Sequence, residues 1–432
     1  MPKYQIPQEW CFTTLGEVVE LKYGKSLPAT KRDGGSFPVY GSNGVVGNHS
    51  EPLVKTEGII IGRKGSYGEI QLSHSPFFPI DTTYYVDDFY EQPLKYWFYQ
   101  LKLLPLTELN RSTAIPGLNR EDAYSQVIHL PPLAEQKVIA DKLDTLLAQV
   151  ETTKARLERI PETLKTFRQS VLAAAVSGRL TAEWKSKSLI LEDISYFQNG
   201  FAFKSGWFES EGEYQVIKLG NIRDGYLAVE NSPAFVKQDV AADYLRFTPE
   251  SGDTLISMTG TRFKQDYGFG CLVRNEKNLL VNQRVGRLIP NRAVVLPEYL
   301  NIYVRSELFR IQFFEGETGG VNQGNVGSKH IMNIGINLPT IEQQTEIVRK
   351  VEQLFAFGDS IEEKVSAALE RVNKLTQSIL ARAFRGALTS DWRADNPELI
   401  SGENNAEALL EKIKTERATM KPVKKKSARK KA

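Results

Sequence analysis

The sequence predicts an α+β protein in which two α/β domains are joined by two long antiparallel helices that form a coiled coil, with a pseudo-two-fold internal repeat. Three observations predict this fold class. A segment of about 55 residues occurs twice, each copy carries a heptad of apolar residues, and each copy follows a stretch of short strand-like runs. A chain of 432 residues is long enough for such a multidomain arrangement.

The repeat aligns residues 130–184 with residues 338–392 at a constant shift of 208. LPPLAEQKVIADKL falls on LPTIEQQTEIVRKV, and QSVLAAAVSGRLTAEW falls on QSILARAFRGALTSDW. About 17 of about 55 positions are identical without a gap. A fixed internal period indicates a duplicated structural unit.

Both copies of the repeat predict a long helix, because apolar residues recur at alternating steps of four and three. In the first copy they are Ile139, Leu143, Leu146, Val150, Leu157, Ile160, Leu164, Phe167 and Val171, with the polar Thr153 at one position of the pattern. In the second copy they are Ile347, Val351, Leu354, Ile361, Val365, Ala368, Val372, Leu375 and Ile379, with Gly358 at one position of the pattern. A heptad sustained over this length predicts a coiled-coil seam.

Proline and glycine mark where these helices begin and end. Proline precedes each helix, at Pro131 and Pro339, and glycine follows each helix, at Gly178 and Gly386. These are the residue types that suit a first helical turn and a left-handed helix cap. Pro161 stands inside the first helix and predicts a kink. At 1.5 Å per residue, ~40 residues would span about 60 Å.

The segments that precede the helices are rich in glycine, asparagine, aromatic and β-branched residues, which predicts short strands joined by turns. Their openings, LGEVVELKYGKS and LEDISYFQNGFA, also match weakly. The predicted organisation is a first domain, a central helical spacer, a second domain, a distal helical spacer, and a C-terminal helix with a basic tail: residues 1–129, 130–184, 185–337, 338–392 and 393–432. Two paired helices would then run antiparallel with one domain at each end, a two-fold plan that matches oppositely oriented DNA half-sites.

Composition narrows the class of protein. No apolar run approaches the ~18–20 residues that span a bilayer, and the polar start lacks a signal-peptide segment. Two cysteines are too few for a disulfide framework, so we expect a cytoplasmic protein with reduced thiols. The net charge is +3, and residues 421–432 hold seven basic residues, so the rest carries 3 − 7 = −4. Any DNA contact must therefore use local patches.

The chain lacks the motifs of the enzymes that act on DNA. Neither a methyl-donor glycine turn followed by an N/D-P-P-Y/F loop nor a P-loop is present, since Val19 stands where the first P-loop glycine should be before Gly24, Lys25 and Ser26. The histidines and cysteines show no zinc spacing: His49, His74, His129, His330, Cys11 and Cys271. We expect no catalytic residue and no metal site.

Several stretches resemble the specificity (S) subunit of type I restriction-modification systems over nearly the whole chain. They are PVYGSNGVVG (38–47), IIIGRKGSYG (59–68), FPIDTTYYV (78–86), IPGLNREDAYSQVIHLPPLAEQ (115–136), NQGNVGSKHIMNIGINLPTIEQQ (322–344) and ENNAEALLEKIKTER (403–417). The ordered set, with two copies of the LP..EQ helix start, carries the resemblance. The lysine-rich end departs from the simplest family pattern.

The resemblance implies a non-catalytic subunit that binds a bipartite, asymmetric double-stranded DNA target. The two domains would be target recognition domains, one for each half of the target. The helices would be spacers that dock two methyltransferase (M) subunits, and two restriction (R) subunits would complete the enzyme. S-adenosylmethionine, ATP and Mg²⁺ would belong to those partners, with no cofactor in this chain and no membrane partner.

Candidate DNA contacts are the Arg, Lys, Asn, Gln and hydroxyl side chains of glycine-flanked loops, because such groups read base edges and phosphates. In the first domain they are Lys22, Tyr23, Lys25, Asn43, Arg63, Lys64, Ser66, Tyr67, Arg111, Asn119 and Arg120. In the second domain they are Asn221, Arg223, Arg262, Lys264, Gln283, Arg284, Asn322, Gln323 and Asn325. The alternative for each residue is an exposed turn without a DNA contact.

Candidate partner contacts are the apolar residues at the helix ends and in the amphipathic C-terminal segment. They are Ala173, Val176, Leu180, Trp184, Phe384, Leu388, Trp392, Leu409, Leu410 and Ile413. The alternative is that they pack onto the chain's own domains. Two other functions stay open: a free-standing DNA-binding regulator and a coiled-coil scaffold that binds protein at each end.

Overall fold

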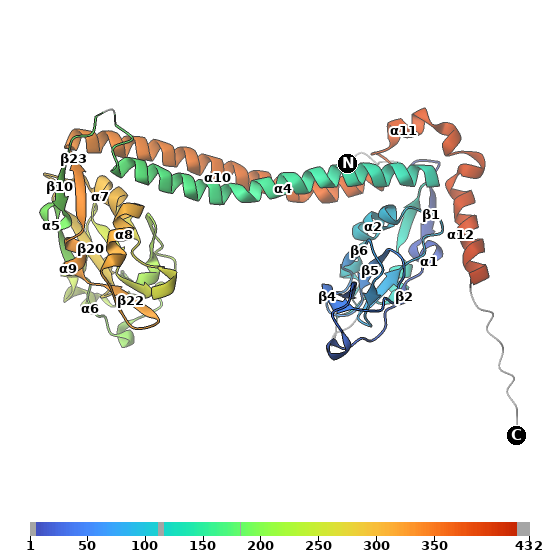
Figure 1. Ribbon diagram of the computed structural model, residues 1–432, viewed down its shortest axis with the longest axis horizontal. Coiled ribbons are helices and arrows are strands. Elements are labelled where there is room, and N and C mark those ends of the chain that lie inside the picture. The colour runs from blue at the N-terminus through green and yellow to red at the C-terminus, as the bar shows by residue number, and fades with distance from the viewer. Residues whose placement is uncertain (1–5, 111–115, 182, 421–432) are drawn as a thin grey trace, which may run out of the picture. The chain divides into compact units, whose positions relative to one another are not determined.

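The computed structural model describes residues 6–110, 116–181 and 183–420, and the chain forms two compact units. The first unit contains Met1–Glu158 and Ala367–Ala432, and the second contains Arg159–Ser366. Both long helices contribute to both units (Figure 1). The five-part division drawn from the sequence therefore stays a prediction, and each unit is described by itself.

In the first unit, β-strands form three sheets. The four-stranded antiparallel sheet has the order β2-β8-β5-β6, the three-stranded sheet has the order β4-β3-β7, and β1 pairs with β9. The strands are β1 (Cys11–Thr14), β2 (Lys22–Tyr23), β3 (Phe37–Gly41), β4 (Gly44–His49), β5 (Gly58–Gly62), β6 (Ile70–Ser73), β7 (Phe78–Pro79), β8 (Thr83–Val86) and β9 (Val127–Leu130). Helix α2 (Leu94–Leu103) packs on β5 and β6 (Figure 1).

The remaining helices of the first unit close its core. They are α1 (Leu15–Val18), α3 (Arg120–Tyr124), the start of α4 (Leu133–Val176), the end of α10 (Ile341–Ala383), α11 (Ser390–Asp395) and α12 (Ala406–Met420). Leu380 and Ala383 from α10 lie in the same apolar core as Ile139 and Leu143 from α4. The end of one long helix therefore packs on the start of the other, which makes them antiparallel.

In the second unit the same plan recurs with more strands. The sheets have the orders β11-β20-β16-β18, β15-β12-β19, β17-β22-β21, β10-β23 and β13-β14. The strands are β10 (Ser186–Ile190), β11 (Ser195–Asn199), β12 (Tyr214–Ile217), β13 (Ile222–Arg223), β14 (Tyr226–Leu227), β15 (Phe235–Val236), β16 (Thr254–Ser257), β17 (Thr259–Thr261), β18 (Gly270–Leu272), β19 (Leu279–Val281), β20 (Val285–Pro290), β21 (Glu317–Gly319), β22 (Gln323–Val326) and β23 (Gly335–Pro339). The helices are α5 (Leu191–Ile194), α6 (Gln238–Ala242), α7 (Pro297–Val304), α8 (Glu307–Glu315) and α9 (Ser328–Met332).

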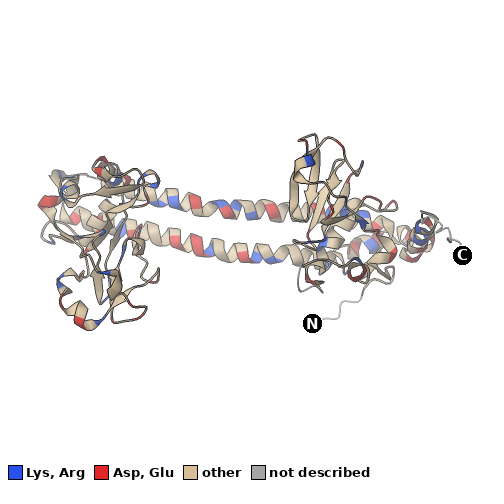
Figure 2. Ribbon diagram, turned by 90° about the horizontal axis from the view of Figure 1, so that it is seen from below, with Lys and Arg blue, Asp and Glu red and all other residues tan. Residues whose placement is uncertain are grey.

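The predicted fold class is confirmed. Each unit has a four-stranded antiparallel sheet, a three-stranded sheet with one parallel pair, and a two-stranded pair next to a long helix. Val171 and Leu172 of α4 share a core with Ile347 and Val351 of α10, so the helices are antiparallel in the second unit as well. Basic and acidic residues both occur along the length of α4 and α10 (Figure 2).

The structure confirms some of the predictions made for the two long helices and not others. Gly178 and Gly386 both adopt positive φ, at 80° and 77°, as a left-handed cap requires. Helix α4 continues without a break through Pro161, and a bend there stays a prediction. Leu375, predicted on the seam, is 44% exposed, and the buried residues in this stretch of α10 are Val372, Leu380 and Ala383.

Candidate nucleic-acid interface

In the first unit, two predicted arginines converge on one predicted tyrosine. The guanidinium carbons of Arg63 and Arg120 lie 5.3 and 5.0 Å from the ring centroid of Tyr23. Arg63 leaves β5 and Arg120 begins α3, so the fold brings together residues that are 57 positions apart in the chain. Arg63 also donates from Nη2 to the backbone oxygen of Asp81 at 2.6 Å. The result is a fixed cationic and aromatic surface.

The tyrosine beneath this cluster is part of the core. The hydroxyl of Tyr84 donates to the Leu118 oxygen at 3.2 Å, and its ring meets that of Tyr23 edge-on at 5.1 Å. Burial, together with the neighbouring Tyr23, raises the pKa of Tyr84 to about 12. Tyr84 therefore stays a neutral support for the exposed Tyr23.

The other predicted contacts of the first unit have three kinds of environment. Lys25, Asn43, Lys64 and Ser66 are exposed at loops, and Tyr67 is half-buried. Lys22 pairs with Asp87 at 2.6 Å, which offsets its charge. Asn119 accepts a hydrogen bond from the Glu121 amide at 2.8 Å and caps α3, so its carbonyl already has a structural partner. Arg111 lies outside the described residues.

In the second unit, four predicted residues line one cavity. The cavity has a volume of about 430 Å³. Its walls include Arg223, Arg284, Asn322 and Gln323, together with Thr261 and the single carboxylate of Asp266. These side chains come from β13, the β19–β20 connection and the start of β22. Two guanidinium groups and two amides in one concavity are the groups that read guanine and adenine edges.

Asn221 is a correction. It is fully buried, its Nδ2 donates to the backbone oxygens of Ala228 and Asn231 at 2.9 and 2.8 Å, and its Oδ1 accepts from the Lys218 amide at 2.9 Å. Both polar atoms of the side chain are therefore hydrogen-bonded to the backbone of the surrounding turns. The prediction of a DNA contact at Asn221 is therefore wrong, since a polar residue in a loop can serve the backbone of the loop itself.

The remaining predicted residues of the second unit frame this cavity. Arg262 pairs from Nε with Glu317 at 3.0 Å, and Glu317 also accepts from the Tyr267 hydroxyl. Lys264 and Gln283 are exposed, and Asn325 is half-buried in β22. Arg262 is thus anchored at the base of its loop, whereas Lys264 extends into solvent.

Sequence reasoning missed two apolar side chains on this surface. Phe263 is 79% exposed and Val321 is 76% exposed. They lie just beyond the paired residues Thr261 and Gln323, at the same end of the sheet β17-β22-β21. Gln265, two residues after Phe263, adopts a positive φ of 46°, and its backbone oxygen accepts from Arg310 at 2.9 Å, which fixes the loop conformation. The sequence signal that could have pointed to Phe263 is a bulky apolar residue between two cations, Arg262 and Lys264.

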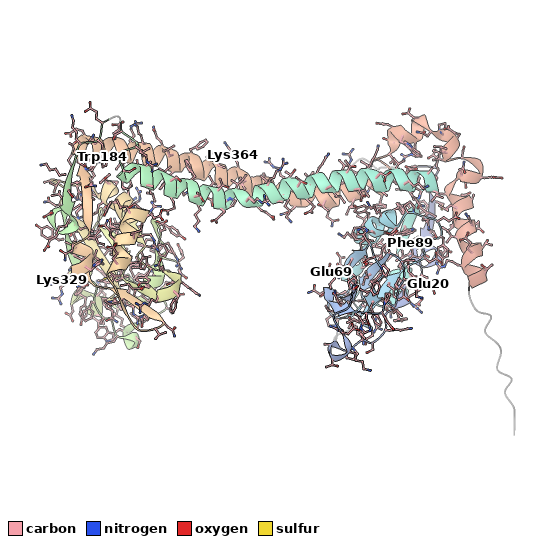
Figure 3. The ribbon with its side chains drawn as sticks, viewed as in Figure 1. Glu20, Glu69, Phe89, Trp184, Lys329 and Lys364 are labelled. Carbon is pink, nitrogen blue, oxygen red and sulfur yellow. The ribbon has the colours of Figure 1, made fainter. Side chains whose placement is uncertain are left out.

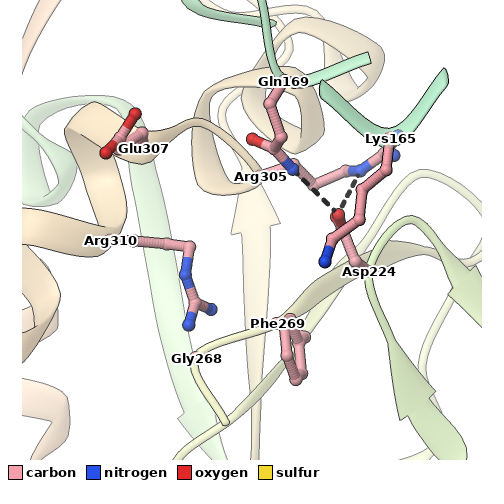
Figure 4. A pocket seen from close by; sticks show the side chains of 8 residues that line it. All are labelled: Lys165, Gln169, Asp224, Gly268, Phe269, Arg305, Glu307 and Arg310. Carbon is pink, nitrogen blue, oxygen red and sulfur yellow. Dashed lines mark hydrogen bonds and ion pairs between the residues drawn. The ribbon is translucent and has the colours of Figure 1, made fainter. Parts of the chain in front are cut away.

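The second unit is also tied to its long helix by a polar contact. Asp224 accepts from Arg305 Nε at 2.9 Å and from Gln169 Nε2, on α4, at 3.2 Å (Figure 4). Lys165 and Arg310 line the same pocket. Both nitrogens of Arg310 that donate do so to backbone oxygens, of Tyr267 and Gln265. The contact orients the strands relative to this end of α4.

The predicted partner contacts are mostly internal. Five residues are buried in the core of their own unit: Val176, Phe384, Leu409, Leu410 and Ile413. For these five the prediction of a partner contact is wrong, because the helix ends and α12 must cover the sheets next to them. Leu180 and Leu388 are partly buried on the same cores. Ala173, Trp184 and Trp392 are half-buried, and Trp184 follows the end of α4 (Figure 3).

The described residues contain no group of three or more His, Cys, Asp and Glu side chains able to hold a metal ion. Of the helices in the described ranges, none has the length and apolar character needed to cross a bilayer. The two polar loop clusters described above are Tyr23, Arg63 and Arg120 in the first unit, and Arg223, Arg284, Asn322 and Gln323 in the second unit.

Comparison with known proteins gives a consistent picture. Residues 7–162 and 182–371 match the family model described as type I restriction modification DNA specificity domain. The chain is 41% identical over 355 residues to the type I restriction enzyme EcoBI specificity subunit of Escherichia coli, covering 75% of this chain and 72% of that one. It is 33% identical over 443 residues to the Escherichia coli EcoDI specificity subunit, covering 96% of each.

Solved structures share the fold at low sequence identity. A structure described under complex assembly and conformational transition of the type I R-M system gives a TM-score of 0.66 at 16% identity, over 89% of this chain and all of that chain. The HsdS subunit from Thermoanaerobacter tengcongensis gives a TM-score of 0.55 at 18% identity, over 89% of this chain and 99% of the other.

Proposed function

Since the chain belongs to the type I restriction modification DNA specificity family, we infer that it supplies DNA sequence specificity to a type I restriction-modification enzyme. Each unit would read one half of a split, asymmetric target. The observation that carries this proposal is the duplicated plan, in which each unit presents its own polar loop cluster. The clusters differ in sequence, whereas the helices that follow them are alike, so the two half-sites would differ.

We propose a division of labour between two kinds of contact. In the first unit, Arg63, Arg120 and Lys64 would hold phosphates or a base edge beside Tyr23. In the second unit, Arg284, Arg223 and Gln323 would read base edges from the cavity. Arginine and amide side chains give the strongest base discrimination in the major groove, whereas exposed lysines position the duplex.

The partners and cofactors follow as further proposals. The chain would carry no catalysis and would bring two methyltransferase subunits, and in the complete enzyme two restriction subunits, to the target. S-adenosylmethionine, ATP and Mg²⁺ would be used by those partners. The spacer helices support this proposal, since they carry charged residues of both signs along their length (Figure 2).

Genomic methylation mapping tests the function. A strain that carries this gene with its partners is compared with a strain in which this gene alone is deleted. We expect methylation to disappear at one split, asymmetric motif. Unchanged methylation, with expression of the partners confirmed, would contradict the proposal. Tight, salt-sensitive binding of the motif by the chain without partners would favour a free-standing regulator.

A further inference from the structure

The C-terminal helix α12 covers one face of the first unit. Its apolar side chains enter the core, and Ile413 is fully buried. Three basic side chains of α12 contact residues of α1 and of the turn before α2. Lys414 pairs with Glu17 at 3.5 Å, Lys412 pairs with Glu91 at 2.5 Å, and Arg417 donates to the Gly16 oxygen at 2.8 Å. The covered face consists of β1, α1 and the turn before α2.

The repeat defines the equivalent face in the second unit. Cys11 of β1 lies opposite Leu130, and Lys187 of β10 lies opposite Leu338, which is Leu130 shifted by 208 positions. Glu17 and Asp193 stand at the same third position of α1 and α5, and each caps its helix. In three dimensions Lys187 therefore takes the place of Cys11, and Asp193 takes the place of Glu17.

That equivalent face is an open pocket with a volume of about 880 Å³. Its apolar wall comes from the segment between α4 and β10, from β10, from the turn before α7 and from the β23–α10 junction: Trp184, Leu189, Val294, Leu338 and Ile341. Val294 is 37% exposed although it is aliphatic. The polar residues on its rim include Lys187 and Asp193. Within the described residues of the second unit, no helix lies where α12 lies in the first.

We propose that this pocket docks an amphipathic helix of a partner protein, with an acidic residue in the helix's first turn facing Lys187 and a basic residue seven positions later facing Asp193. Residues seven apart lie on one face of a helix. The pattern is the one that α12 itself carries, with Glu407 in its first turn and Lys414 seven residues later. The polarity of the docked helix would be that of α12.

Two observations support this charge pattern. The Cys11 thiol donates to the backbone oxygen of Ala406 at 3.5 Å, directly before Glu407 in the first turn of α12. Glu407 contributes, after burial, to raising the pKa of that thiol to about 11. A lysine in the place of Cys11 would therefore meet an acidic side chain in the first turn. Lys414 pairs with Glu17, so a basic side chain two turns along would meet Asp193. The occupant is a partner's helix because α12 of this chain is buried in the first unit.

The probe for this pocket is a fluorescently labelled peptide of residues 403–420, titrated with the full chain and followed by fluorescence anisotropy. We expect saturable binding. The Lys187→Glu variant should weaken binding about fivefold, as expected for reversal of one partly exposed ion pair. A peptide with Glu407→Lys should restore binding to Lys187→Glu and bind the parent chain less well. Val294→Asp should remove binding.

A matched control is Lys329→Glu, the same charge change on the exposed face of α9 (Figure 3). It should bind the peptide like the parent chain. Three results overturn the proposal: no saturable binding to the parent chain, binding unaffected by both Lys187→Glu and Val294→Asp, or no rescue by the charge-reversed peptide. A peptide that only displaces α12 would give the second result and would also speed alkylation of Cys11. Far-ultraviolet circular dichroism of each variant separates lost binding from lost folding.

Discussion

Lys142 Nζ lies 3.1 Å from the backbone oxygen of Leu388, and the same contact recurs 208 residues later, where Lys350 Nζ lies 2.6 Å from the backbone oxygen of Leu180. Each contact joins the start of one long helix to the turn that follows the other. Carbonyl groups just past a helix end lack helical donors, and lysine supplies one. The repeat is therefore a repeat of interactions as well as of sequence.

A second repeated contact gives the first prediction. Gln136 and Gln344 are both fully buried, and each donates from Nε2 to a proline oxygen, of Pro131 at 3.0 Å and Pro339 at 2.9 Å. Gln344→Leu leaves that oxygen and the Leu296 amide without their partners. We expect a loss of about 1–3 kcal/mol in the free energy of unfolding, measured in urea.

Lys364→Ala, an exposed change on the same helix (Figure 3), is the control and should stay within about 0.5 kcal/mol of the parent. An equal effect of both substitutions would show that the buried amide contributes nothing.

The second prediction concerns a buried carboxylate in the first unit. Glu135 is fully buried and accepts from Arg393 at 2.5 Å, from Thr389 at 2.5 Å and from Trp10 Nε1 at 2.8 Å. Arg393→Ala removes the only charge of opposite sign among these partners, so we expect a loss of about 3–5 kcal/mol. Adding Glu135→Gln should recover much of this loss, because the equivalent residue in the second unit is the neutral Gln343. A double variant as unstable as Arg393→Ala would contradict this explanation.

A third prediction uses Cys11 as a reporter for α12. Burial, and then the charge of Glu407, raises the pKa of this thiol to about 11. Only about one thiol in a thousand is ionised at pH 8, and the reactive thiolate increases about tenfold per pH unit up to that pKa. Iodoacetamide should therefore label Cys11 slowly at pH 8 and faster as the pH rises.

Ile413→Asp should detach α12, lower this pKa and accelerate labelling at pH 8. Cys271, whose pKa burial raises to about 12, is the internal control and should stay unlabelled in the folded chain. Peptide mass spectrometry distinguishes the two thiols, and unchanged labelling of Cys11 in Ile413→Asp would mean that α12 does not shield it.

Periodicity made most of the fold predictable. The heptads and the helix-ending glycines predicted α4 and α10, and the 208-residue shift predicted the duplicated plan. Local pattern could not show that α12 packs on the first domain, because Leu409, Leu410 and Ile413 would look the same on a free amphipathic helix. Burial of those three residues depends on β1 and α1, which lie about 400 residues earlier in the chain.

The candidate site was less predictable than the fold. Residue type predicted Arg223, Arg284, Asn322 and Gln323, and the fold places all four on one cavity. Residue type could not separate these from Asn221, whose side-chain amide donates hydrogen bonds to backbone oxygens of the surrounding turns. Whether a loop residue faces solvent or its own backbone depends on tertiary contacts that carry no periodic signal.

The fourth prediction concerns the exposed Phe263. An apolar side chain that protrudes between cations can insert at a base step and bend the duplex. Phe263→Ala, assembled with its methyltransferase partners, should bind a duplex carrying the mapped motif about fivefold more weakly, by fluorescence anisotropy. Phe12→Ala is the matched control, since Phe12 is an exposed phenylalanine on β1 and belongs neither to the candidate DNA contacts nor to the spacer helices. Equal affinities of the two variants for the duplex would show that Phe263 does not contribute to DNA binding.

The last prediction assigns one half of the target to the second unit. Arg284 lines the cavity that also holds Arg223 and Gln323, and all three belong to this unit. Arg284→Ala should lower discrimination at one base by about 1–3 kcal/mol and so relax one position of one half-site in a methylation map. Arg292→Ala is the matched control, because Arg292 is an exposed arginine of the same unit that does not line the cavity and donates to the Ser251 oxygen. A change in both half-sites, or equal maps for the two variants, would contradict the assignment.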